Sequence, residues 1–170
     1  FSLFAAESGL VFYVDTTVKT SGKKGTADRP FTSLEQAVAA AHTHINQQAA
    51  SVKNNTREAV SIFLRSDVFV DEALFLTVPI RLHGVNNPSI TFGENAGFVV
   101  DQTALEIKEC SIKRSERFTE PRTVPVLYGS YAAITLNGVS VMLKEGGDAV
   151  ILRDDSRLTC TDTSFSSEQN

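Results

Sequence analysis

"ITLNGV", residues Ile134–Val139, alternates apolar and polar side chains and then reaches a pair of residues suited to a sharp corner. Alternation places the first and third residues on one face of a strand, while Asn137 and Gly138 both tolerate positive φ. Three segments align with it without gaps: "IRLHGV" (80–85), "LEIKEC" (105–110) and "LTCTDT" (158–163). One such unit cannot bury its apolar face alone, so the repeat predicts stacked coils of parallel strands. "IFLRS", aligned from Ile62, is a shorter and earlier candidate coil.

One segment before these repeats has a helical pattern instead. Thr32 and Glu35 fit a T-x-x-E capping box, which satisfies free amides at a helix start. Apolar residues then recur at helical spacing and form one stripe, which predicts a helix over residues 33–48. The stripe comprises Leu34, Ala37, Val38, Ala41 and Ile45. Its small residues suit a helix that lies flat against another surface of the protein.

"FYVDTT…GTADRPFTSLEQAVAAA" resembles the N-terminal entry of right-handed parallel β-helix proteins of the pectate-lyase-like superfamily. "VSIFLRSDVFVDEALFLTVPIRLHG" resembles their first coil, with Asp67-Val68-Phe69 where Gly-x-Tyr is usual. The resemblance implies an all-β fold with one capping helix, a right-handed single-stranded parallel β-helix of about four to five short coils. We expect a single domain over 1–170, with strand, loop and cap in 10–58 and coils in 59–170. The ending "TSFSSEQN" has no cap signal, which suggests a fragment of a longer chain.

Composition narrows the classes of partner. The chain has 170 residues and a formal net charge of −4, with a pI near 5.4. An acidic chain without a basic face predicts no nucleic-acid partner, and no apolar run is long enough for a membrane span. Because "FSLFAA" could be the stub of a processed N-terminus, we expect a secreted or cell-surface protein. Its expected partner is a polysaccharide, or a cell-envelope or host surface protein.

Polysaccharide-cleaving members of the similar family carry carboxylates on outward columns of one sheet, and the lyases add calcium. The aligned outward column here is Phe63, Arg81, Glu106, Thr135 and Thr159. It holds one carboxylate where acid/base hydrolysis needs two, and Arg81 and Glu106 should form a surface ion pair on neighbouring coils. The sequence therefore predicts a binding module with no catalytic residues, metal or other cofactor. The alternative is a polysaccharide lyase or glycoside hydrolase, or the N-terminal part of one, and only the lyase would use calcium.

One acidic pair lies outside that column. Asp154 and Asp155 are adjacent, so on a strand they would point to opposite faces. Asp is favoured in turns, and we predict a turn at this position.

The stretch "KRSERFTEPR" (113–122) departs from the repeat and accounts for the longest interval between coils. It predicts a loop extruded from one corner, and loops on rigid scaffolds often carry function. Its candidate ligand-binding residues, suited to an acidic ligand, are Lys113, Arg114, Arg117, Phe118 and Arg122. The alternative is a solvated surface loop without a ligand.

The two cysteines are predicted to be unpaired. In the aligned repeats Cys110 occupies the sixth position and Cys160 the third, two coils away. Two strand spacings already separate them by roughly 9–10 Å, beyond the reach of a disulfide. The third position faces inward, so we expect Cys160 to be a buried and inert thiol.

Overall fold

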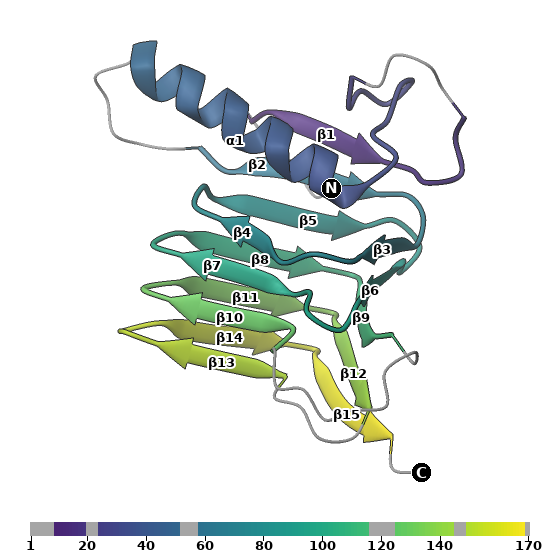
Figure 1. Cartoon of the computed structure of the whole chain (residues 1–170), viewed down its shortest axis with the longest axis vertical. Coiled ribbons are helices and arrows are strands. Elements are labelled where there is room, and N and C mark those ends of the chain that lie inside the picture. Colours follow the sequence, from purple (N-terminus) through teal and green to yellow (C-terminus); the bar gives the residue numbers. More distant parts are fainter. Residues whose placement is uncertain (1–8, 20–23, 52–57, 116–124, 145–148, 169–170) are drawn as a thin grey trace, which may run out of the picture.

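The computed structural model describes residues 9–19, 24–51, 58–115, 125–144 and 149–168, and nearly half of them lie in three parallel sheets (Figure 1). Sheet A contains β1 (Val11–Val14), β2 (Val60–Leu64), β5 (Ile80–Gly84), β8 (Ala104–Lys108), β11 (Ala133–Asn137) and β14 (Arg157–Thr161). Sheet B contains β3 (Val68–Val70), β6 (Ser89–Phe92), β9 (Ser111–Arg114), β12 (Ser140–Lys144) and β15 (Ser164–Glu168). Sheet C contains β4 (Leu74–Leu76), β7 (Phe98–Asp101), β10 (Leu127–Ser130) and β13 (Val150–Arg153). The helix α1 (Leu34–Ser51) lies across the N-terminal end of the stack (Figure 1).

The chain visits the sheets in a fixed order, A then B then C, before it begins the next coil. Each strand pairs in parallel with the strand one coil earlier. Ile80, Leu105, Ile134 and Leu158 therefore lie side by side in sheet A, which confirms the register predicted from the four aligned segments. The predicted coils of short parallel strands are present.

The earliest segment is in a different register from the predicted one. Val60 pairs with Ile80, and Ile62 pairs with Leu82, so the alignment of Ile62 with Ile80 was wrong by two residues. A slip of two residues leaves the inward and outward faces unchanged. The alternation of side chains therefore could not distinguish the two registers.

The core lies between the sheets and consists of inward columns of aliphatic side chains. Ile62, Leu82, Ile107 and Leu136 occupy one such column and have no exposed surface. Complete burial of a side chain of this size contributes about 1.5–3 kcal/mol. Between sheets B and C the rings of Phe92 and Phe98 pack edge to face, with centroids 5.1 Å apart.

The corners after sheet A use residues in the left-handed conformation. Glu109, Gly138 and Asp162 have φ of 52°, 63° and 48°, as the repeat predicted for the fifth position. The first corner differs, because positive φ falls at Asn86 and Asn87 instead of Gly84. Gly84 is still required there, since a Cβ on it would lie 1.9 Å from the carbonyl oxygen of Glu109.

The corner from sheet C to sheet A in the last coil is an acidic turn. Asp154 and Asp155 have φ of 52° and 54° and are exposed, which confirms the predicted turn. The two adjacent carboxylates therefore mark a change of chain direction between β13 and β14.

The helix α1 covers the N-terminal end of the core, as predicted. It packs against β1, β3 and β4, and its apolar stripe is buried from Leu34 to Ile45. Its N-cap is one residue later than expected: the Ser33 hydroxyl accepts a hydrogen bond from the Gln36 amide at 3.3 Å. Ser33 and Gln36 therefore occupy the capping-box positions that the sequence analysis gave to Thr32 and Glu35.

The loop before the helix folds back on the outer edge of β1. The Phe31 amide donates to the Tyr13 carbonyl, and the Asp15 amide donates to the Phe31 carbonyl. Gly25 has a φ of 72°, and a Cβ on it would lie 2.3 Å from the Phe31 ring and 2.8 Å from the Phe12 ring. Glycine lets the loop approach these rings and cover an otherwise free strand edge.

The last coil is more open than the coils above it. Both cysteines are free, as predicted, and Cys110 is fully buried. Cys160 pairs in register with the buried Leu136, but it is exposed, so the prediction of a buried thiol was wrong. The physical reason is its position on β14, the terminal strand of sheet A. Phe165 on β15 is likewise 47% exposed.

Candidate functional site

The outer face of sheet A carries a column of polar side chains, one from each coil. Pairing aligns Ser61, Arg81, Glu106, Thr135 and Thr159 along this face. Ser61 takes the place that the sequence analysis gave to Phe63, because of the two-residue slip in β2. The column crosses the strands, so it runs along the axis of the stack (Figure 1).

A groove of about 580 Å³ lies beside this column. Ser61, Arg81, Glu106 and Thr135 line it with polar groups. Its remaining lining includes small or short residues at the preceding outward positions, namely Gly9, Ala59, Pro79, Ala104 and Ala133. Short side chains next to longer polar ones leave a hollow on an otherwise regular sheet surface. The groove crosses several neighbouring strands, which suits an elongated ligand.

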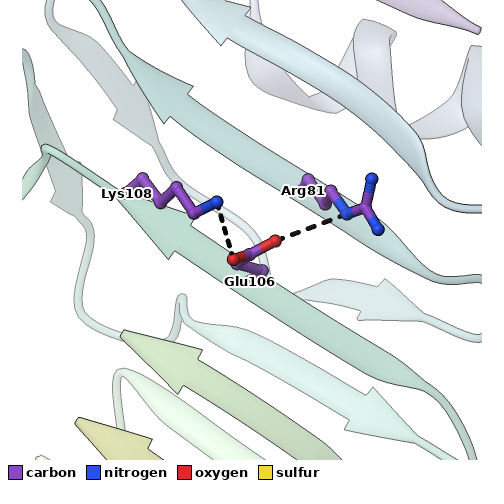
Figure 2. A network of polar contacts seen from close by, with 3 residues as sticks. All are labelled: Arg81, Glu106 and Lys108. Carbon is purple, nitrogen blue, oxygen red and sulfur yellow. Dashed lines mark ion pairs between the residues drawn. The ribbon is translucent and has the colours of Figure 1, made fainter. Parts of the chain in front are cut away.

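Two charged residues of the groove, Arg81 and Glu106, form a connected set with Lys108 of the same sheet face (Figure 2). Arg81 Nε lies 3.3 Å from Glu106 Oε2, which confirms the predicted ion pair between neighbouring coils. Lys108 Nζ lies 2.9 Å from Glu106 Oε1, a partner that the sequence analysis missed. The side chains of Arg81 and Glu106 are 44% and 27% exposed, so the pair adds only about 0.5 kcal/mol of stability.

In this set, Glu106 holds the Arg81 side chain in one orientation. Glu106 engages Arg81 through Nε, and the two terminal guanidinium nitrogens point away from it (Figure 2). Those nitrogens are paired donors in a fixed plane, a geometry that matches ligands with two neighbouring oxygen acceptors. Two cations and one carboxylate leave the set with a formal charge of +1.

No protein family, curated protein or solved structure matches this chain. In the described ranges, no helix has the length and apolar content that a membrane crossing requires.

A stack of aromatic rings forms the next outward column of sheet A. The Tyr13 and Phe63 rings stack with centroids 5.5 Å apart, and Phe63 and His83 stack at 4.9 Å. The Arg65 guanidinium lies over the Tyr13 ring at 4.3 Å and donates to the Ala27 carbonyl at 2.8 Å. Stacking turns the ring faces toward one another, so the column stiffens the sheet next to the groove.

The structure describes only part of the loop that the sequence analysis proposed as a ligand site. Arg117, Phe118 and Arg122 lie outside the described residues. Lys113 pairs with Thr91 at an outward position of β9 and is half-buried. Its proposed role in binding stays a prediction.

Arg114 has a structural role in the described part of the chain. It pairs with the buried Phe92, which is an inward position. Its Nη1 donates to the backbone carbonyls of Gly93, Glu94 and Ala96 at 2.7, 3.2 and 2.8 Å. Burial lowers the pKa of this guanidinium from its ordinary value. Arg114 thus fixes the loop between β6 and β7.

The groove contains two carboxylates, and the described residues hold no cluster of three or more side chains suited to a metal ion. Glu106 is engaged by two cations, whereas Glu58 is exposed at the groove beside β2. The sequence analysis missed Glu58 because it precedes the first strand of the repeat. Only the pairing of β2 with β5 could have placed it near Arg81.

Proposed function

We propose that this chain is a secreted or surface-exposed parallel β-helix module that binds a polysaccharide or protein ligand and performs no catalysis of its own. The proposal includes a right-handed coil and a place in the pectate-lyase-like superfamily. Three parallel sheets and a helix across the N-terminal end support that assignment.

The oriented guanidinium of Arg81 carries the functional proposal. Glu106 fixes this side chain beside a hollow floored by alanine and proline, and Thr135 adds a hydroxyl two coils beyond Arg81. A sugar chain has weakly polar ring faces and a rim of hydroxyls, whereas an extended peptide has apolar side chains beside the polar amides of its backbone. Either can place its less polar face on the short side chains and its oxygens against Arg81.

A binding screen with matched variants tests this proposal. Labelled protein is applied to a glycan array and to intact cell surfaces, and the experiment is repeated with Arg81→Ala and with Arg29→Ala. Arg29 is also exposed but lies in the loop before α1, outside the groove. We expect Arg81→Ala to lower binding about tenfold or more while Arg29→Ala binds as wild type does. Equal binding by all three proteins would refute the groove as the site.

A second candidate function is polysaccharide cleavage, which the two carboxylates of the groove favour. Acid/base cleavage of a glycosidic bond needs two carboxylates, and the groove offers the exposed Glu58 together with Glu106. Incubation with polysaccharides that bind on the array, followed by measurement of new chain ends, distinguishes the two functions. Release that is lost in Glu58→Gln would establish an enzyme, and binding without release supports the module.

A further inference from the structure

The outer face of sheet C carries an apolar stripe that is separate from the groove on sheet A. The register aligns Phe75, Val99, Tyr128 and Ile151, one from each strand of the sheet. Phe75 is 65% exposed, and the other three are half-buried. The inward neighbours of these residues, such as Leu76 and Val100, already fill the core. The stripe is therefore a row of apolar side chains outside the core, one from each strand of sheet C.

We propose that this stripe docks an amphipathic helix of a partner protein. This proposal is independent of the groove on sheet A, since it concerns another outer face and another partner. The four strands of sheet C have three or four residues each, so the face is at most about 13 Å wide and about 14 Å high. A helix with its side chains is about 10–12 Å across and covers most of that width.

The spacing of the stripe also matches a helix. Successive strands present one apolar side chain about every 4.8 Å, and a helix presents one apolar residue per turn of about 5.4 Å. Over three intervals the two repeats differ by only about 2 Å. A helix with apolar residues at i, i+4, i+7 and i+11 can thus contact every strand of sheet C.

The size of the face argues against a second copy of this chain as the occupant. The face measures on the order of 200 Å², whereas a stable protein–protein interface buries about 800 Å² on each partner. A single docked segment matches the available surface more closely.

Charges beside the stripe define the direction of the helix. Asp101 on β7 and Arg153 on β13 lie in the adjacent outward column, with Ser130 between them. They are two strand spacings apart, or about 10 Å. The docked helix should therefore place a cation opposite Asp101 and an anion opposite Arg153, about two turns later.

The test uses a designed peptide and two phenylalanine variants. The probe is a fluorescently labelled amphipathic peptide with both termini blocked and with leucine at i, i+4, i+7 and i+11. It carries one lysine placed to face Asp101 and one glutamate placed to face Arg153. Its anisotropy is measured against wild type, Phe75→Ser and Phe69→Ser. Phe69 is 51% exposed but lies on sheet B, so it is a matched control. Circular dichroism checks that both variants keep the wild-type fold.

We expect Phe75→Ser to weaken peptide binding about tenfold or more, and Phe69→Ser to leave it unchanged. Arg153→Glu should weaken binding, and a peptide with its glutamate changed to lysine should restore it. Three results would overturn the proposal: no binding of the peptide to wild type, equal losses in both phenylalanine variants, or a dimer in sedimentation that Phe75→Ser dissociates. None of them bears on the groove, whose own test uses Arg81.

Discussion

The inward position of Arg114 gives the sharpest test of the structure. Replacement of Arg114 by methionine keeps an apolar stem of similar length and removes the guanidinium. Three backbone carbonyls in residues 93–96 then lose their donor. Hydrogen bonds to a charged group contribute about 1.5–3 kcal/mol each, and water can replace part of that at a half-buried site. We therefore expect a loss of about 3 kcal/mol in the free energy of unfolding.

Thermal unfolding followed by circular dichroism measures this loss. For a chain of this size, about 3 kcal/mol lowers Tm by roughly 6–12 °C. Lys113→Met is the matched control, because Lys113 is the neighbouring cation on the outward face of the same strand. That variant should melt within about 2 °C of wild type. If the two variants melt at the same temperature, Arg114 does not hold the loop and its assignment to the inward face is wrong.

Three further variants or reagents test how tightly the core and one corner are packed. Val38→Asp puts a carboxylate into the covered end of the core, so it should lower the free energy of unfolding by several kcal/mol and lower Tm sharply. Asn46→Ala, at an exposed position of the same helix, should leave Tm close to the wild-type value. Alkylation of the native protein at pH 8 should label Cys160 quickly and Cys110 very slowly, because burial blocks access to Cys110 and raises its pKa to about 12, which leaves very little thiolate at pH 8. Mass spectrometry that finds both cysteines labelled equally would contradict the burial of Cys110. Gly84→Ala should reduce the yield of folded protein, since its Cβ would meet the Glu109 carbonyl; a wild-type Tm would show that this corner is looser than described.

Alternation of side chains was enough to predict the stacked parallel strands and the pair of Arg81 with Glu106. Both depend on which face a residue occupies, and period-two patterns report that directly. The same pattern does not change when a strand shifts by two residues along its neighbour. For that reason Phe63 was assigned to the position that Ser61 occupies. Residues 113–122 break the repeat and were interpreted as an extruded loop, but Lys113 and Arg114 at its start belong to β9, with Arg114 at an inward position.

The features that the sequence did not predict depend on contacts between coils. The groove needs Ala104 and Ala133 beside Glu106, and the apolar stripe needs Phe75 in register with Val99. The segments of sheet C are short and share no repeated sequence pattern, so their register could not be predicted from the sequence. Exposure of Cys160 likewise follows from its place on a terminal strand, where no further coil among the described residues covers it.

Residues one coil apart are in-register neighbours in parallel sheets. Nuclear Overhauser contacts between backbone protons detect such neighbours. Ile134 should show contacts to Leu105 on one side and to Leu158 on the other, repeated at Leu136 with Ile107 and Cys160. Contacts between sequence-adjacent strands in the antiparallel pattern of hairpins, with none between these coils, would contradict the account.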